Sequence, residues 1–475
     1  MTITSRPHVI IFPYPALGHI TPALHLASAL FSTFDITFVT TTFYLARTQQ
    51  ILAKDHSQLI SDVNVVGLSE GLPGGEGSTD NLPRLAEATE GPVLSQGFDN
   101  LVVELLEKKQ LIAIITDTFL GWVQDIANRY SLPRFLFYTP PASVLSLMFQ
   151  LEGFQKDGLL SPSSEKLITI PGFPKELQLS DLPSHLQDSS KFMFGYFLRH
   201  ASRVKEAAGI LCNTVYDLEK NVIDALRSGE ISQAKNVPIW TAGPMISATF
   251  FEDQVEKKPS TSTPLNDTEV VSEEQQCLTW LDTQEEDSVV YISFGSIAVL
   301  SEQQIHHLAQ ALLSTNKRFL WVLRQPEGCT SALPENFLND TKEQGLIVSW
   351  SPQPKVLAHP AVRVFLTHCG WGSTIEAISL GKPLIAWPCF AEQKINTRFL
   401  VDGLHAAIEV KKDTNGMADT TVIIDVIERF YSDEGQVIVN NMEQLRTVVQ
   451  KAVKEDGSSK QGLKDFMNAI LKYSV

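Results

Sequence analysis

The sequence lacks the marks of a secreted, disulfide-bonded or membrane-spanning protein. Its five cysteines are scattered and never spaced as Cys-x-x-Cys, so neither a disulfide framework nor a zinc site is indicated. The only apolar run near the N-terminus, Val9 to Phe12, is too short for a signal peptide or a membrane span, and Pro13 follows it directly. We therefore expect a cytoplasmic protein, in a reducing environment, that has no membrane span.

Positive charge is also scarce. The chain carries 38 Lys and Arg residues against 54 Asp and Glu residues, a formal net charge of −16. Most of such a surface repels polyanions, which excludes nucleic acid as a partner and means that any phosphate must be bound locally. We expect small-molecule partners and a monomeric chain.

Three motifs that would identify other enzyme classes are missing. No Gly-x-Gly-x-x-Gly follows the first predicted strand, which argues against a dinucleotide oxidoreductase. No Gly-x-x-x-x-Gly-Lys-Ser/Thr occurs, which argues against an NTPase. No Asp-x-Asp pair occurs either, whereas a metal-dependent transferase would usually need such carboxylates to hold the cation that bridges a diphosphate. We expect neither a metal nor a bound cofactor.

The sequence instead contains two successive series of alternating strand and helix patterns, which indicates an α/β protein. Its 475 residues exceed the size at which a single core stops growing, so two domains are expected. Residues 247–275, rich in Ser, Thr, Pro and charged residues, are predicted to link them. The apolar runs typical of parallel strands are His8–Phe12, Asp35–Thr41 and Leu111–Thr116 before the linker, and Val289–Phe294, Arg318–Leu323, Leu346–Trp350, Val362–Thr367 and Pro383–Trp387 after it.

Capping patterns predict where two of the helices begin. Thr21 has the character of an N-cap, with Pro22 at the first helical position. Ser301 is followed by Gln304 three residues later, which is the spacing of a capping box. A last helix is expected at about Gly462 to Tyr473.

Two ionisable residues follow strands of the first domain: His19 after the first strand and Asp117 directly after Leu111–Thr116. Ligands of open α/β sheets gather at the carboxyl ends of the strands, so both side chains can reach one crevice. A carboxylate bonded to one imidazole nitrogen fixes the tautomer and supports the charge gained when the other nitrogen removes a proton. The pair is a candidate general base. The alternative is that His19 merely precedes a helix and Asp117 caps the next one.

A strand-to-helix turn with two glycines, His368 to Glu376, follows Val362–Thr367 in the second domain. Backbone amides at such a helix start bind phosphate well. Ser373 and Glu376 also have the Ser-x-x-Glu spacing, so a capping box without any ligand is the alternative, and the two can coexist. The loop Ser293 to Ser296 follows another strand and could offer further phosphate donors or be only a turn.

Two other groups of side chains have both a binding and a structural interpretation. Trp350 ends a strand, where an exposed indole would suit base stacking and a buried one would be part of the core. Glu392 and Gln393 carry carboxylate and amide groups, which hydrogen-bond sugar hydroxyls well, although a polar helix start has the same composition. The residues alone leave both alternatives open in each case.

Taken together, these motifs resemble the signature of the plant secondary product glycosyltransferases, which would span residues 350–393. The matching positions are Trp350-Ser-Pro-Gln353, Val356-Leu357, His359-Pro360, His368-Cys-Gly-Trp-Gly-Ser373, Glu376, Gly381, Pro383, Pro388 and Glu392-Gln393. The likeness extends through the whole chain, because Pro13–His19, Asp117, Thr139 and Ser293–Ser296 lie where the family-1 UDP-glycosyltransferases have their own motifs. It implies the GT-B fold, in which two Rossmann-like domains face an interdomain cleft.

The resemblance also implies how the chain is divided. Residues 1–246 would form an N-terminal acceptor-binding domain, and residues 247–275 the linker. Residues 276–455 would form the C-terminal domain that binds the UDP-sugar. Residues 456–475 would form a C-terminal helix that could pack back on the N-terminal domain.

By this resemblance the second domain holds the nucleotide part of UDP-glucose, which is a donor substrate rather than a cofactor. Trp350 would stack on uracil, and Gln353 would contact ribose or uracil. Glu376 would bind the ribose hydroxyls. The residues implied as diphosphate contacts are His368, Ser373 and Ser296.

The resemblance further assigns the sugar contacts and the base. His19 resembles the catalytic base and Asp117 its partner. Gly372, in the phosphate-binding turn, stands where the family usually has Asn, which leaves extra room there; Leu17 replaces a frequent Gln, and Glu392 replaces a commoner Asp. Gln at the last signature position is associated with glucose rather than galactose. The implied sugar-binding residues are Trp371, Glu392, Gln393 and Thr139.

The expected function is therefore inverting transfer of glucose from UDP-glucose to a hydroxyl of a small hydrophobic acceptor, such as a phenolic or a terpenoid. Pro140–Phe149 and Phe192–Phe197 are rich in Phe and Leu, and either line the acceptor site or belong to the core. Two alternatives stay open. One is a C-glycosyltransferase that acts on an activated phenol ring. The other is a UDP-sugar binding protein or epimerase that works without an acceptor.

Overall fold

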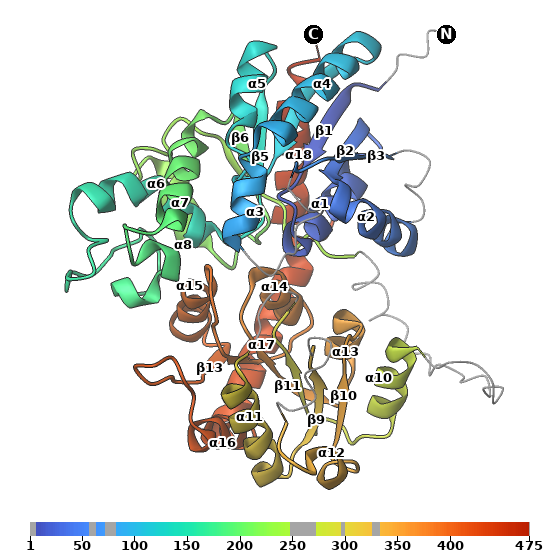
Figure 1. Cartoon of the computed structure of the whole chain (residues 1–475), viewed down its shortest axis with the longest axis vertical. Coiled ribbons are helices and arrows are strands. Elements are labelled where there is room, and N and C mark those ends of the chain that lie inside the picture. Colours follow the sequence, from blue (N-terminus) through green and yellow to red (C-terminus); the bar gives the residue numbers. More distant parts are fainter. Residues whose placement is uncertain are drawn as a thin grey trace, which may run out of the picture. The chain divides into compact units, whose positions relative to one another are not determined.

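The computed structural model describes residues 6–56, 63–71, 82–247, 272–295, 300–324 and 333–474. The chain divides into two compact units, residues 1–247 with 451–475 and residues 248–450. Each unit is built on one parallel sheet with helices packed on it (Figure 1). Within the described ranges, no helix is both long and apolar enough to cross a bilayer. Most of the predicted linker, 247–275, lies outside the described residues.

The first unit contains a seven-stranded parallel sheet with the order β3-β2-β1-β4-β5-β6-β7. The direction in which strands are added reverses between β1 and β4, and ligands of open α/β sheets bind at the carboxyl ends of the strands at such a switch point. The first three predicted strands are confirmed as β1, β2 and β4. The strands are β1 (His8–Phe12), β2 (Asp35–Thr41), β3 (Val63–Leu68), β4 (Leu111–Thr116), β5 (Arg134–Tyr138), β6 (Gly209–Cys212) and β7 (Ile239–Thr241).

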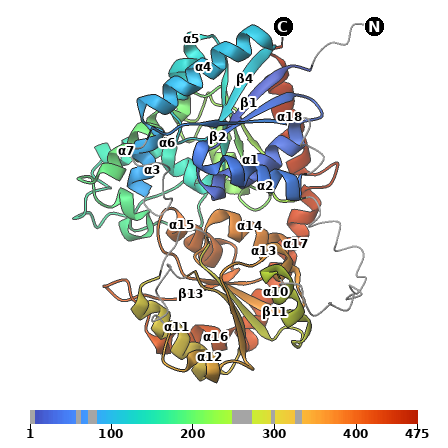
Figure 2. The ribbon, with the colours of Figure 1, turned by 45° about the vertical axis from the view of Figure 1, so that its right-hand side comes forward.

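Alternate side chains of these strands enter two separate cores. Val9 and Ile11 of β1 belong to one apolar cluster, and Ile10 and Phe12 belong to the other, as the two-residue period of a strand requires. The first cluster is covered by α1, α2 and α18, and the second by α4 and α5 (Figure 2). The helices of this unit are α1 (Leu17–Leu30), α2 (Thr42–Asp55), α3 (Leu82–Thr89), α4 (Pro92–Lys108), α5 (Val123–Arg129), α6 (Ala142–Lys156), α7 (Phe192–Ser202), α8 (Lys220–Ser228) and α18 (Ser458–Leu471).

Helix α18, at the end of the chain, belongs to the first unit. Its side chains Phe466 and Ile470 are fully buried in the same cluster as Val9 and Phe135, and the ring centroids of Phe466 and Phe135 lie 5.5 Å apart. The first and last segments of the sequence therefore share one hydrophobic core.

The second unit repeats this plan with a six-stranded parallel sheet of order β10-β9-β8-β11-β12-β13. Its switch point lies between β8 and β11. The predicted strands are confirmed, with ends that differ by at most two residues. The strands are β8 (Val289–Ser293), β9 (Arg318–Val322), β10 (Gly345–Val348), β11 (Val362–Thr367), β12 (Leu384–Ala386) and β13 (Ala407–Glu409).

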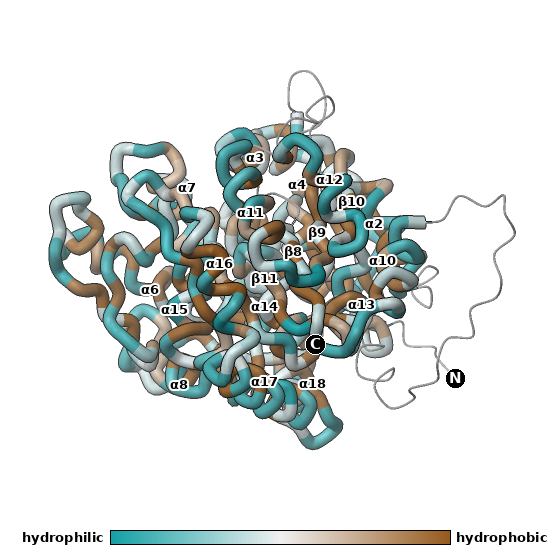
Figure 3. The backbone as a smooth tube through the Cα atoms, turned by 90° about the horizontal axis from the view of Figure 1, so that it is seen from below, coloured by the Kyte–Doolittle hydropathy of each residue, from teal (hydrophilic) through white to brown (hydrophobic). Residues whose placement is uncertain are grey.

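The strands of this sheet are the most apolar part of the second unit, as the brown tube at β9 shows, whereas the surrounding helices carry long hydrophilic stretches (Figure 3). The predicted cap of α11 is confirmed, because Ser301 Oγ accepts a hydrogen bond from Gln304 N at 3.3 Å. The helices are α10 (Glu273–Asp282), α11 (Glu302–Thr315), α12 (Phe337–Asp340), α13 (Gln353–Ala358), α14 (Trp371–Ser379), α15 (Gln393–Arg398), α16 (Thr420–Arg429) and α17 (Asp433–Ala452).

Candidate active site

His19 lies in the first turn of α1, not before it. The helix begins at Leu17 after Ala16, whose extended backbone accepts from His19 N and Ile20 N at 2.9 Å each. The predicted start at Thr21 and Pro22 is therefore wrong, and Pro22 lies inside the helix. A proline there removes the amide that would bond to the carbonyl four residues earlier. That carbonyl belongs to exposed Gly18, where water can replace the lost donor.

His19 and Asp117 form a hydrogen-bonded pair in the first unit. His19 Nδ1 lies 2.6 Å from Asp117 Oδ2, and the side chains are 21% and 4% exposed. Because an ionised carboxylate can only accept, Nδ1 carries the proton, and Nε2 is left with a lone pair that can accept one. Asp117 Oδ1 also accepts from Phe119 N at 3.0 Å. Asp117 thus holds a local turn and orients the imidazole at once. The alternative that it caps the next helix is wrong, because α5 begins at Val123 with Trp122 as its N-cap.

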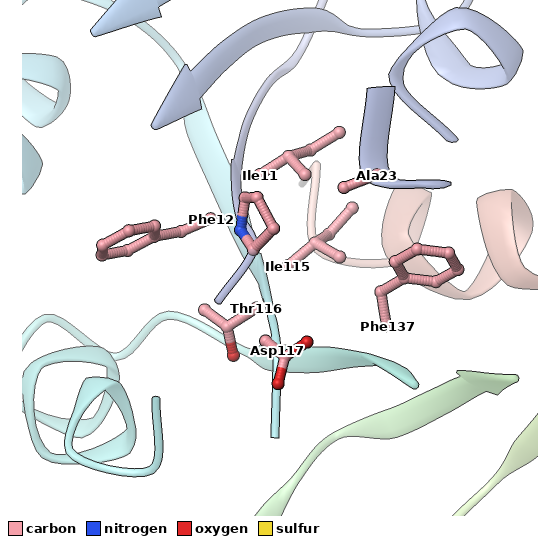
Figure 4. A pocket seen from close by; sticks show the side chains of 8 residues that line it. Ile11, Phe12, Ala23, Ile115, Thr116, Asp117 and Phe137 are labelled. Carbon is pink, nitrogen blue, oxygen red and sulfur yellow. The ribbon is translucent and has the colours of Figure 1, made fainter. Parts of the chain in front are cut away.

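The inner side of Asp117 faces a dry, apolar space at the ends of β1 and β4. It is lined by Ile11, Ile115 and Phe137, with Thr116 and Asp117 at its edge (Figure 4), and it does not admit a water molecule. A charge pair bordered by apolar atoms is screened less than one in water. This holds for the inner side of Asp117, whereas His19 is 21% exposed.

Thr139 lies against the same imidazole. It follows β5, is 6% exposed, and places Oγ1 3.0 Å from His19 Nδ1. With the Nδ1 proton directed at Asp117, the threonine oxygen shares that N–H as a second acceptor. The structure thus brings three of the predicted residues together at one nitrogen.

Aromatic rings surround the pair. The ring centroids of Tyr14 and Phe119 lie 5.5 Å and 6.3 Å from that of His19, and Phe197 of α7 lies 4.9 Å from Phe119. Phe192 at the start of α7 is 46% exposed. In α6, by contrast, every residue from Ala142 to Phe149 is buried. Flat apolar surface is therefore available next to His19 from the β4 loop and α7.

In the second unit, the start of α14 is an uncapped helix N-terminus that follows β11. Its N-cap, Gly370, gives no side-chain hydrogen bond, and Thr374 N is bonded to Gly370 O at 3.0 Å. Ser373 lies within the first turn and not at the cap, so the capping box proposed as an alternative for Ser373 and Glu376 is wrong. Amides at such an N-terminus point toward an anion in the manner of phosphate sites.

His368 is packed between two glycines. A Cβ on Gly295 would lie 2.7 Å from Cε1 of its ring, and a Cβ on Gly370 would lie 2.5 Å from Nε2. Burial lowers the pKa of His368 to about 4. At neutral pH the ring is therefore uncharged and offers an N–H donor rather than a cation.

Gln353, Ser373 and Glu376 form one hydrogen-bonded group. Gln353 Nε2 donates to Glu376 Oε2 at 2.8 Å and to Ser373 Oγ at 3.0 Å. Burial raises the pKa of Glu376 to about 7, against the opposing hydrogen bond from Gln353. The structure thus joins the predicted ribose and phosphate contacts through one amide.

Tyr291 of β8 was missed by the sequence analysis. It is fully buried, and its hydroxyl lies 2.8 Å from Ser351 Oγ and donates to Gln353 Oε1 at 3.4 Å. A hydroxyl in a buried, otherwise apolar strand must find a partner. That rule was the available signal, but it does not say which residue the partner is.

The remaining predicted residues lie on three segments of the second unit. Trp350 is partly buried beyond β10, and Trp371 is 3% exposed at the first position of α14. Gly372 follows it, and a Cβ there would meet nothing within 4 Å. Ser296 lies outside the described residues.

Glu392 and Gln393 lie where α15 begins. Glu392 is its N-cap residue. Gln393 is 3% exposed, and its Oε1 accepts from Cys389 N and Phe390 N at 2.8 and 2.9 Å. Since the oxygen already accepts from two backbone amides, the side-chain N–H₂ group of Gln393 is the one that can bond a sugar hydroxyl.

We expect Gly295→Ala to weaken UDP binding by about tenfold or more. The residue has a φ of +76°, which costs an L-residue roughly 1–2 kcal/mol, and its methyl group would displace the His368 ring. Calorimetric titration with UDP measures the affinity. Gly416→Ala is the matched control, because Gly416 has a φ of +77° with nothing within 4 Å. Equal UDP affinity in folded Gly295→Ala and Gly416→Ala would contradict the expectation that a methyl group at residue 295 disturbs UDP binding through the His368 ring.

The chain matches known proteins over its whole length. Residues 267–434 match the family model described as "UDP-glucoronosyl and UDP-glucosyl transferase". A 7-deoxyloganetin glucosyltransferase of Gardenia jasminoides is 33% identical over 97% of this chain and 96% of that protein. The solved structure of a Polygonum tinctorium UDP-glucosyltransferase capable of glucosylating indoxyl is similar with a TM-score of 0.85 and 29% identity, over 98% of this chain and 99% of that one. A Phytolacca americana structure with UDP-2-fluoro-glucose and pterostilbene gives a TM-score of 0.84 at 28% identity, with the same coverage.

Proposed function

Because the chain belongs to the UDP-glucoronosyl and UDP-glucosyl transferase family, in its plant family-1 group, we propose that it transfers glucose from UDP-glucose to a hydroxyl of a small hydrophobic acceptor, with inversion. The predicted family, UDP-glycosyltransferase activity and GT-B fold are confirmed by the matches over the whole chain. Its relatives include plant glucosyltransferases of small molecules. The acceptor, the mechanism and the residue roles below belong to the proposal.

The observation that carries the mechanism is the 2.6 Å bond between His19 Nδ1 and Asp117 Oδ2. It leaves Nε2 free of a proton, so His19 removes the acceptor hydroxyl proton as the oxygen attacks the anomeric carbon. The bond from oxygen to carbon forms as the bond from carbon to the diphosphate oxygen breaks. Asp117 stabilises the imidazolium that results.

The leaving diphosphate gains negative charge as that bond breaks. The amides that begin α14, the hydroxyl of Ser373 and the N–H of uncharged His368 are preorganised donors for such charge. Ser296 is proposed as a further contact. In this mechanism, these donors replace a metal ion.

The rest of the donor is assigned to the partly buried and hydrogen-bonded side chains of the second unit. Trp350 stacks on uracil, and Gln353 and Glu376 bind ribose. The amide of Gln393 donates to a glucose hydroxyl, because its oxygen already accepts from two backbone amides. The other proposed sugar contacts are Trp371 and Glu392 of the second unit and Thr139 of the first. Gly372 is proposed as a further donor contact.

The proposed function is tested with purified protein, UDP-glucose and a library of phenols and terpenoid alcohols. We expect release of UDP that depends on the acceptor and a product heavier by one hexose in mass spectrometry. EDTA should leave the rate unchanged. Release of UDP without any acceptor would indicate a hydrolase, and a product linkage stable to acid would indicate carbon glycosylation. No acceptor-dependent product at all would refute the proposal.

UDP-glucose affinity should rise as the pH increases from 6 to 8. Glu376 has a raised pKa of about 7, so it is largely protonated at pH 6 and ionised at pH 8, and only the carboxylate accepts from two ribose hydroxyls. Because Glu376 must lose one proton to bind in this way, the UDP-glucose affinity is expected to rise about tenfold between pH 6 and pH 8. Titration calorimetry with UDP-glucose measures it, and Glu376→Gln should bind more weakly and without this pH dependence. If the UDP-glucose affinity of Glu376→Gln still depends on pH, a group other than Glu376 is responsible for that dependence.

The compartment and assembly belong to the proposal too. Among the described cysteines, Cys212, Cys277 and Cys369 are buried free thiols and Cys389 is a half-buried one, the state that a reducing cytosol maintains. A monomer is proposed, and light scattering coupled to size-exclusion chromatography measures its mass.

A further inference from the structure

A buried carboxylate in the first unit lies outside the site described above. Glu219 is 2% exposed, at the N-cap of α8. It accepts from Ala142 N at 2.8 Å, from Ser143 N at 2.9 Å and from Thr214 Oγ1 at 2.6 Å. Burial raises the pKa of Glu219, and these hydrogen bonds oppose that rise. A fully buried carboxylate is costly unless hydrogen bonds compensate for the lost water.

What Glu219 holds is the beginning of α6. The N-cap of that helix is Pro141, which supplies no side-chain cap. The two amides that Glu219 accepts from belong to the first two residues of the helix, Ala142 and Ser143. These amides have no acceptor within the helix, and a negative group at a helix N-terminus is stabilising. Glu219 therefore caps α6 from a segment 76 residues further along the chain.

The capped helix start leads directly to the imidazole. Thr139 is separated from α6 only by Pro140 and Pro141, whose rings restrict φ to a narrow range. If the first turn of α6 shifts, Thr139 is therefore expected to move with it. Thr139 Oγ1 lies 3.0 Å from His19 Nδ1, so such a shift reaches the nitrogen that also bonds Asp117.

We propose that Glu219 is a positioning residue that, by capping α6, holds Thr139 against His19 and keeps the imidazole aligned for proton removal. This role rests on the proposed function and deepens it. Asp117 fixes the proton on Nδ1, and Thr139 limits rotation of the ring about that bond. Glu219 keeps Thr139 in place without touching a substrate.

The test compares two acceptors in Glu219→Gln and in wild type. An alcohol acceptor needs the base, whereas a nitrophenol that is already ionised at the assay pH does not. We expect kcat for the alcohol to fall by about 10- to 100-fold, kcat for the ionised phenol to stay within about threefold, and KM for UDP-glucose to be unchanged. Thr139→Val should lower kcat for the alcohol more than kcat for the ionised phenol, because the loss of its proposed sugar contact affects both acceptors alike, and Thr139→Ser should restore most of the rate.

Coupling between the two residues gives an independent check. If Glu219 acts through Thr139, the double variant should be no slower than the slower single variant, whereas independent roles would multiply. Asp224→Asn is the matched control, because Asp224 lies on α8 and its carboxylate bonds, among the described side chains, only Tyr216 and Lys220. Thr214→Val, which removes one donor to Glu219, is the milder variant to use if Glu219→Gln does not fold.

Wild-type kcat in folded Glu219→Gln, an equal loss with both acceptors, or multiplicative effects in the double variant would each overturn the proposal. An NMR titration of the His19 ring gives a readout that does not depend on turnover. Glu219→Gln and Thr139→Val should both move its midpoint, and an unmoved midpoint would count against the proposal. If wild type transfers no sugar, the proposed function fails, while this titration still decides whether Glu219 acts on His19.

Discussion

Replacing His19 with alanine is expected to lower kcat for an alcohol acceptor by about 10³-fold or more, since a positioned general base contributes on the order of 10²–10⁴. The methyl group leaves Asp117 without the imidazole 2.6 Å away, and no other base is bonded to that carboxylate in the described structure. UDP affinity should be unchanged, because the residues proposed to bind UDP lie in the second unit. Initial rates and calorimetric titration with UDP measure the two quantities.

The matched control for this variant is His306→Ala. His306 is an exposed histidine of α11 whose ring bonds only Gln310 among the described residues, so its loss should change neither rate nor affinity. An acceptor that is already ionised should restore much of the rate in His19→Ala, because it needs no base. Wild-type turnover of the alcohol by a folded His19→Ala protein would refute the assignment.

Asp117→Asn is expected to reduce kcat for an alcohol by a similar factor, about 10³-fold, although it changes the shape of the side chain very little. Asp117 now accepts twice, from the imidazole at 2.6 Å and from Phe119 N at 3.0 Å. Asparagine has one oxygen, so it can serve only one of these donors. If the oxygen stays on the backbone amide, the N–H₂ group faces Nδ1 and drives the imidazole proton to Nε2, the atom that must act as the base.

The tautomer itself can be observed. Nitrogen NMR of the imidazole should show the proton on Nδ1 in wild type and on Nε2 in Asp117→Asn at neutral pH. Asp117→Ala should be slow as well, but without a forced tautomer. A rate for Asp117→Asn within threefold of wild type, or an unchanged tautomer, would show that the carboxylate only caps its turn.

The strands could be predicted from the sequence because parallel strands buried on both faces are continuous apolar runs. His8–Phe12 and Val362–Thr367 were predicted to the residue. The start of α1 could not be predicted, because a proline such as Pro22 is typical of the first helical position and suggested a later start. In the structure the helix begins five residues earlier at Leu17, since the turn at Ala16 supplies the acceptor for the first amides.

The meeting of His19 with Asp117 could be anticipated, because both follow strands that a Rossmann-like order makes neighbours. The partners of these residues could not. Tyr291 and Glu219 act through contacts between segments far apart in the sequence, and no local pattern marks them. The two glycines beside His368 lie in loops that the sequence did mark, but it gave no sign that Gly295 would contact the ring. The Ser373–Glu376 spacing even suggested a local cap, whereas Glu376 is bonded to Gln353 instead.

The position of α18 delays completion of the N-terminal core during synthesis. Phe466 and Ile470 complete a core that also contains Val9 and Phe135. A nascent chain from which residues 1–247 have emerged therefore still lacks the helix that covers one side of that core. With elongation at about 5–20 residues per second, the N-terminal unit must wait roughly ten seconds or more for its last helix to leave the ribosome. Truncated products that end before residue 458 should therefore expose apolar surface and be targets for chaperones and proteases.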